Sequence, residues 1–218
     1  MAYKVYFDNV DVLTDYGVFL IKERGLLNPL RHKTPYTHDW DDNHGLEIAD
    51  GLLMADVRRI QLELGIKASS RANFRGNLFD FYDDILGSSG LVQLRIDEHS
   101  KVNMVMIDGH NDLERLTFWN DIQMVGRVKI NFLDPYPINR QWLNSGSSQS
   151  TVTVDATAAA DADETLTVFW GDGTRAEVSE NGGGVTSNYS SWPKRIVVAG
   201  RLDLFTTISC TNATEQTW

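Results

Sequence analysis

The chain contains little cysteine and no long apolar run. Cys210 is the single cysteine among 218 residues, so the chain cannot form an internal disulfide or build a zinc-thiolate cluster. The first residues, MAYKVYFDNVDV, lack the basic start and apolar core of a secretory signal, and no stretch approaches the roughly 20 apolar residues of a membrane span. These absences predict a soluble protein that is cytoplasmic when made and does not insert into a membrane.

Basic residues are also scarce. The chain has 20 Lys and Arg against 30 Asp and Glu, a formal net charge of -10. Sequence-independent binding of nucleic-acid phosphates needs a cationic face, so this balance predicts no nucleic-acid partner. With 42% hydrophobic residues, the chain is long enough for one large domain or two small ones, each with its own core.

Sequence signatures of catalysis are missing as well. There is no G-x-S-x-G elbow, and the glycines of NGGGVTSN (181–188) are not followed by the Lys-Ser/Thr ending of a phosphate loop. The acidic residues around GDG (171–173) lack the spacing of a calcium loop. We therefore expect a protein that is not an enzyme and that holds no cofactor.

One stretch does have the composition of a metal site. The segment YTHDWDDNHG (36–45) contains His38, Asp42 and His44, the ligand types that a metal-dependent hydrolase would need. Asn43 and Gly45, however, favour a turn, which would leave the side chains at a solvated tip. The pattern predicts a polar β-hairpin tip in preference to a metal centre.

Short alternating segments dominate the rest of the chain. RRIQLELGIKAS (58–69) alternates apolar and polar residues, as a half-buried strand does, and similar runs recur on both sides of it. Residues 77–86 change to a helical period, with Asn77 as the expected cap and Gly87 as a left-handed stop. The predicted class is mainly β (α+β): an antiparallel, barrel-like N-terminal sheet with one packed helix, followed by a small β-sandwich.

A boundary follows the last strand of the first unit. DPYPINRQW has two prolines, and LNSGSSQS has linker composition. We therefore expect a first domain over residues 1–138, a linker over 139–150, and a small immunoglobulin-like β-sandwich over 151–218. Trp170 would cover the core of this sandwich, beside a hairpin turn formed by Gly171, Asp172 and Gly173.

The first unit resembles the ring-forming domain of the distal tail protein, the tail-tip hub of long-tailed bacteriophages. The matching features are FDNVDVLTDYGVFLIKE, the hairpin around DWDDNHG, the strand RRIQLELGIKAS, the helix NLFDFYDDIL, and a last strand ending in VGRVKINFLDPYP. The resemblance implies a homo-oligomeric ring, a hexamer, that continues the tail tube and connects it to the baseplate. It also implies partners among the tube, tape-measure and hub or fibre proteins. The location would be the virion tail, and the host cytoplasm during assembly of the phage or prophage particle.

The second unit resembles the polycystic-kidney-disease-type (PKD-like) sandwich. LTVFWGDGT (166–174) carries the likeness, together with the returning strand KRIVVAG, whereas SNYSSWPKR departs from the family pattern. This unit raises an alternative function, a carbohydrate- or receptor-binding accessory protein. Tyr189 and Trp192 would then be the aromatic contacts to a glycan.

Overall fold

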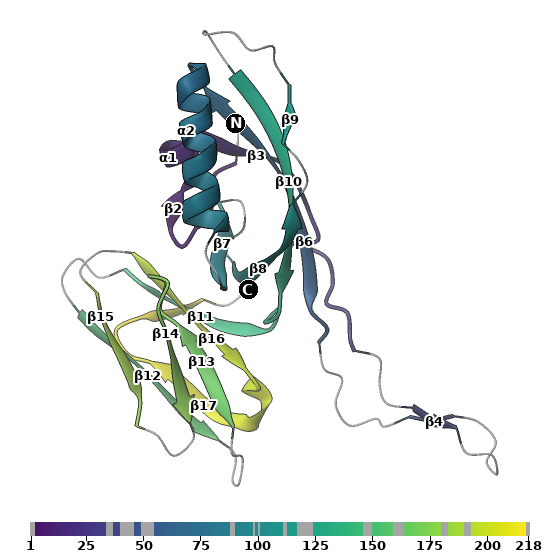
Figure 1. The fold of residues 1–218 in the computed structure, drawn as a ribbon. Coiled ribbons are helices and arrows are strands. Elements are labelled where there is room, and N and C mark those ends of the chain that lie inside the picture. The colour runs from purple at the N-terminus through teal and green to yellow at the C-terminus, as the bar shows by residue number, and fades with distance from the viewer. Residues whose placement is uncertain are drawn as a thin grey trace.

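The structure is a computed structural model in which two β-sheet units lie one above the other (Figure 1). Residues 37–39 and 46–48 are described by their backbone alone. The described residues are 3–33, 37–39, 46–48, 55–87, 90–97, 99, 101–110, 113–116, 124–145, 150–158, 164–179, 183–189 and 193–216.

The N-terminal unit is built on one antiparallel sheet. Its strands are β1 (Val5–Phe7), β2 (Val10–Asp11), β3 (Val18–Arg24), β6 (Arg58–Ala68), β7 (Val92–Ile96), β8 (Val102–His110), β9 (Glu114–Arg115) and β10 (Met124–Asp134). They pair in the order β2-β1-β7-β8-β10-β6-β3, and β9 pairs with β10 as well. The described residues therefore form a mainly β protein with antiparallel sheets, as the sequence predicted.

Strands β6 and β10 form the centre of this sheet. Their register runs without a break from Met124 opposite Ala68 to Asp134 opposite Arg58. Side chains on β10 alternate strictly between buried and half-buried, because successive residues of a strand point to opposite faces. The buried face joins a single apolar core, and the other face is open to solvent.

The long helix covers the buried face of the sheet, but it starts earlier than predicted. Helix α2 (Arg71–Phe81) is capped by Ser70, whose hydroxyl accepts a hydrogen bond from the Asn73 N–H at 3.2 Å, so Asn77 is not the cap. A π-helical turn, η1 (Tyr82–Leu86), continues it. Gly87 has φ -76°, so the predicted left-handed stop is wrong.

The apolar stripe of this helix also differs in part from the prediction. Phe74, Phe81 and Ile85 are buried, whereas Phe79 is 61% exposed. A second helix of one turn, α1 (Val12–Tyr16), lies beside α2. The Asn77 amide donates to the Tyr16 carbonyl at 3.0 Å, so the residue expected to be a cap instead joins the two helices.

The sheet curls around its core without closing. Strands β2 and β3 are the ends of the pairing order. The curl nevertheless brings Glu23 on β3 to 3.7 Å from His99, which lies between β7 and β8. "Barrel-like" is accurate for the curvature, but the described strands form no closed barrel. No helix in the described part of the chain is long and apolar enough to cross a membrane.

A separate hairpin extends from the N-terminal unit. Strands β4 (Thr37–Asp39) and β5 (Leu46–Ile48) pair antiparallel, with His38 opposite Glu47. The hairpin predicted around DWDDNHG is thereby confirmed, although its tip, residues 40–45, lies outside the described residues. Figure 1 shows β4 standing clear of both sheet units. We call residues 37–48 the arm.

The C-terminal unit is a sandwich of two antiparallel sheets. Its strands are β11 (Asn139–Asn144), β12 (Ser150–Ala158), β13 (Thr165–Phe169), β14 (Arg175–Ser179), β15 (Val185–Tyr189), β16 (Lys194–Gly200), β17 (Phe205–Cys210) and β18 (Thr214–Gln216), with a 3₁₀ turn, η2 (Leu202–Leu204). One sheet has the order β14-β13-β16-β11-β18 and the other the order β15-β12-β17.

Strand β11 corrects the predicted linker. Residues 139–144 were expected to join two domains, but they pair with both β16 and β18 inside the sandwich. Gln141 and Asn144 are polar yet almost fully buried, because hydrogen bonds replace the water that they lose. Tertiary contacts of this kind are not visible in the local composition.

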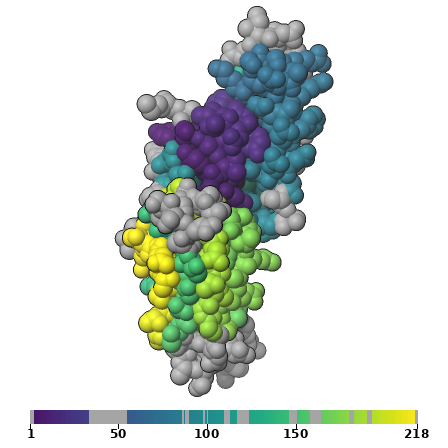
Figure 2. Space-filling view, turned by 90° about the vertical axis from the view of Figure 1, so that its left-hand side faces the viewer, coloured from purple at the N-terminus to yellow at the C-terminus, as the bar shows by residue number. Residues whose placement is uncertain are grey.

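The two units share a packed junction. Strand β16 buries both of its faces: Ile196 and Val198 point into the sandwich core, whereas Val197 and Ala199 pack with Val102 and Met104 of β8. A strand covered on both sides reads as a continuous apolar run, as in KRIVVAG. Figure 2 shows the N-terminal segment directly above the sandwich.

Hydrogen bonds surround this apolar junction. The Gln141 side chain bonds the backbone of Val102 twice, accepting from its N–H at 3.1 Å and donating to its carbonyl at 2.6 Å. Asn9 donates to the carbonyl of Gly171 at 2.7 Å, and Gln93 donates to that of Arg195 at 3.1 Å. The sandwich is therefore held to the sheet by directional contacts as well as by apolar packing.

The turn between β13 and β14 lies close to the backbone of β16. Gly171 and Gly173 both have positive φ, +78° and +85°. A Cβ at residue 171 would overlap the Arg195 carbonyl oxygen, whereas one at residue 173 would meet open space. We expect Gly171→Ala to lower the free energy of unfolding by about 3 kcal/mol and Gly173→Ala by about 1 kcal/mol. Urea unfolding measures both, and equal losses would contradict the overlap.

Candidate functional site

The outer face of the N-terminal sheet, the one opposite α2, is mainly polar, with Phe19, Val125 and Leu133 as apolar residues on it. Because β6 and β10 alternate, their outward side chains form cross-strand pairs instead of a core. Gln61 donates to Asn131 at 2.9 Å. Arg127 donates to Glu63 at 2.9 Å and also forms an ion pair with Glu114 of β9.

This face has the opposite charge to the chain as a whole. Among the described residues of this face, basic ones outnumber acidic ones, although the net charge of the protein is -10. The basic side chains are Lys22, Arg24, Arg59, Lys67, Arg127 and Lys129, and the acidic ones are Glu63, Asp108 and Glu114. An exposed face with this balance suits contact with acidic groups.

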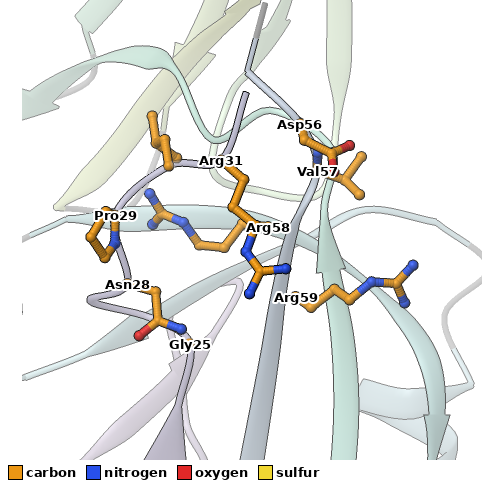
Figure 3. Close-up of a pocket in the computed structure, with 9 residues that line it drawn as sticks. Gly25, Asn28, Pro29, Arg31, Asp56, Val57, Arg58 and Arg59 are labelled. Atoms are coloured by element: carbon orange, nitrogen blue, oxygen red, sulfur yellow. The ribbon is translucent and has the colours of Figure 1, made fainter. Parts of the chain in front are cut away.

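Two adjoining hollows lie where the arm leaves the sheet. The first, of about 160 Å³, lies between the segment after β3 and the start of β6. Figure 3 shows Asn28 and Pro29 on one side of it and Asp56 and Val57 on the other, with the Arg31 and Arg58 side chains between them. A hydrogen bond from the Asp56 N–H to the Arg31 carbonyl, 2.7 Å long, closes this end of the hollow.

The second hollow, of about 400 Å³, opens on the outer face of the sheet. It shares Gly25, Asn28 and Arg59 with the first and adds Arg24. Four arginines therefore surround the two hollows. We call the pair of hollows the arm root.

Arg58 also belongs to a buried cluster of charged groups. Its guanidinium donates to the Leu26 carbonyl at 3.1 Å and to Asn103 at 3.3 Å, while its Nε is buried without a partner among the described atoms. Opposite it lies Asp134, fully buried, with one carboxylate oxygen accepting from the Tyr136 N–H at 3.0 Å. Lys101 is the third charged group of this cluster.

Burial controls the titration of this cluster. It raises the pKa of Asp134 to about 6, an effect that Arg58, the Tyr136 N–H and Lys101 offset in part. Burial, with the positive charge of Arg58, lowers the pKa of the Lys101 ammonium below its usual range. The folded protein therefore holds the Asp134 proton more tightly than the unfolded chain does.

This difference predicts a pH-dependent stability. Between pH 3.8, the ordinary value for the Asp134 carboxyl, and about 6, the folded state binds more protons at this group. Its contribution to the free energy of unfolding thus falls as pH rises through that window and stays low above it. We expect Asp134→Asn to remove about 2–3 kcal/mol of this fall. Urea unfolding from pH 4 to pH 7 measures it, and parallel curves for variant and wild type would contradict the assignment.

The residues considered for a metal site are described only in part. Asp42 and His44 lie outside the described residues, and His38 is described by its backbone in β4. Among described residues no group of three His, Cys, Asp or Glu could hold a metal ion. Burial raises the pKa of the Cys210 thiol to about 12, with Asp155 adding to the effect, so this thiol stays protonated at neutral pH.

Of the two candidate glycan contacts, the structure describes Tyr189. Tyr189 is only 3% exposed, and its hydroxyl donates to the Trp170 carbonyl at 2.8 Å. A stacking platform needs an accessible ring face, and the buried ring of Tyr189 offers none. Burial raises the pKa of Tyr189, as expected for a core phenol. Trp192 lies outside the described residues.

Gly171, Asp172 and Gly173 lie between two paired strands, where the sequence predicts a hairpin turn. Trp170 is buried and the turn joins β13 to β14 as expected. The residues with positive φ are the two glycines that flank Asp172. Asp172 instead accepts a hydrogen bond from the Thr174 N–H at 2.9 Å, which closes the turn.

The arginines of the arm root had no part in the sequence-based hypotheses. Arg24 and Arg31 lie before the arm, and Arg58 and Arg59 lie after it, so the arm separates them along the chain. Their one local signal was the Arg58-Arg59 pair at the start of an alternating strand. That pair was attributed to the strand alone.

The described residues define a class: a mainly β protein in which a curled, helix-backed sheet with a polar outer face is packed on a small sandwich and carries a projecting hairpin. No family description matches the chain, and no curated protein matches it. Among solved structures, it is similar to the crystal structure of the Dit protein of phage SPP1, described as a paradigm of the hub adsorption apparatus in phages that infect Gram-positive bacteria. The likeness covers 91% of this chain and 98% of that chain, with a TM-score of 0.47 and 11% identity.

Proposed function

We propose that the chain is a structural component of a phage or prophage tail tip. Copies would assemble as a ring, a hexamer, that continues the tail tube and connects it to the baseplate or to the receptor-binding apparatus. Residues 1–138 form the ring in this proposal, and residues 151–218 lie at its periphery. The protein acts by assembly and not as an enzyme, and its partners are the tube, tape-measure and hub or fibre proteins.

The open sheet edge is the observation that carries the proposal. In the described part of the chain β6 is the one strand that pairs with β3, so the other side of β3 offers backbone N–H and C=O groups to another chain. Proteins that remain monomeric usually cover or shorten such edges. β3 is instead seven residues long, with Ile21 45% exposed on it. An edge of this kind supports pairing with a neighbouring copy.

The arm and the outer face are consistent with the same role. β4 stands clear of both units, a position that suits contact with another molecule. The helix-covered face of the sheet is apolar and its opposite face polar, which suits a wall that faces a water-filled channel. The order of elements that suggested the resemblance to a distal tail protein supports the proposal further, and the proposed role is of the kind described for SPP1 Dit.

Assembly in solution tests the proposal. Size-exclusion chromatography with light scattering should report a mass near six times 24.6 kDa, alone or after addition of the neighbouring tail proteins. A chain that stays monomeric at high concentration, with and without those proteins, would count against the ring.

Two matched substitutions test the role of the edge. Ile21→Glu places a charge on β3, and Ile138→Glu places one at a residue of similar exposure, 53%, away from that edge. Loss of the apolar contact should weaken association about tenfold in the first variant, because burying half of an isoleucine contributes about 1–2 kcal/mol. The second variant should assemble like the wild type. Equal behaviour of the two variants would exclude β3 from the interface.

A further inference from the structure

The arm root concentrates positive charge in an acidic protein. Four arginines line its two hollows, against Asp56 and Asp108 as the acidic residues. The salt bridge from Arg59 to Asp108 is 3.4 Å long and exposed. Exposed pairs of this kind contribute about 1 kcal/mol or less to stability, so the fold does not depend on the charge of Arg59.

Several arginine donors in the arm root have no partner among the described residues. Arg24 and Arg31 are exposed and form no ion pair with a described residue. The buried Nε of Arg58 also has no partner among the described atoms. Guanidinium donors match carboxylate oxygens in geometry and charge, and such charge-assisted bonds are stronger than neutral ones.

The size of the site narrows the class of ligand. Hollows of about 160 and 400 Å³ that share one wall accept acidic side chains on a short peptide. A nucleic-acid backbone would need a longer basic track, and the net charge of -10 would repel it. The chemistry therefore favours a short acidic peptide segment.

The chain itself contains such a segment. Residues 37–50, THDWDDNHGLEIAD, hold five carboxylates within fourteen residues. Figure 1 shows β4 standing clear of both sheet units, so the backbone of this strand is not folded onto the arm root of its own copy. At contact distance, pairing with arginine outweighs the repulsion between two acidic copies, because salt screens that repulsion beyond about 10 Å.

We infer that the arm root is a carboxylate-binding site that holds the acidic arm segment, residues 37–50, of a second copy of this chain. This partner rests on the proposed self-assembly. The binding chemistry does not, because it needs only the four arginines and an acidic peptide.

A synthetic peptide tests the site directly. Dilute protein that light scattering shows to be monomeric is titrated with the peptide of residues 37–50, and binding is followed by calorimetry. A second peptide carries Asn or Gln in place of the five acidic residues. We expect saturable binding of the first peptide, weakened by salt, and binding at least about tenfold weaker for the neutral one. Equal affinity for both peptides, or no binding of either, would overturn the inference.

Paired variants locate the site. Arg24→Gln combined with Arg31→Gln should weaken peptide binding about tenfold, because two exposed charge pairs are lost together. Arg71→Gln combined with Arg175→Gln makes the same change in charge away from the hollows and should leave binding unchanged. Urea unfolding confirms that both variants fold. Equal loss in the two pairs would mean that only the overall charge matters, and would exclude the arm root.

Two further measurements identify the partner. Inorganic phosphate that displaces the peptide at equal concentration would make the site a general anion site and refute the assigned partner. If the protein stays assembled at every concentration, the variants are compared by mass: Arg24→Gln with Arg31→Gln should dissociate and the control pair should not. A chain that stays monomeric but binds the peptide would refute the ring and support the carboxylate site. A ring that does not bind the peptide and does not dissociate in the Arg24→Gln, Arg31→Gln variant would support the ring and refute the site.

Discussion

The pairing of β6 with β10 is the interaction on which the N-terminal unit depends. Among the described strands, this pair has the longest unbroken register. Successive side chains along each strand point to opposite faces of the sheet. One face joins the core under α2, which includes Phe81 and Ile130. The other carries the polar pairs and the basic residues. The same eleven residues of β6 also place Arg58 and Arg59 at the arm root.

The junction imposes a second constraint. Residues 102–105 of β8 and residues 196–199 of β16 are buried on both faces, so each unit covers apolar residues of the other. Separating the units would expose Phe169 and Val197 to water and leave the Val102 N–H without its Gln141 partner. The sandwich therefore belongs to the folded body, although the division of the chain into domains was expected to fall at this point.

Much of the fold follows from local pattern. The alternation of residues 58–68 and 124–134 predicted their strands closely, because burial of one face imposes a period of two. The start of α2 was missed because residues 71–76, RANFRG, contain Phe74 as their only large apolar residue. Strand β11 was missed because Gln141 and Asn144 are buried by hydrogen bonds that only the tertiary structure provides. The arm root was missed for a related reason: two chain segments on either side of the arm build it, and spacing in sequence carries no sign of their contact.

The packed junction has a geometric consequence for any closed assembly of this chain. A sandwich on a free linker would sample many directions, and its position would carry no information about the rest of the particle. Here the contacts of Gln141, Asn9 and Gln93 fix one direction for every copy. Rotational symmetry would then repeat the sandwich at equal angles around the symmetry axis and at the same position along it, so that the sandwiches would form a second ring of identical surfaces. A displacement of one sandwich would be transmitted to the N-terminal sheet of the same copy, so the two units would move together as one rigid body.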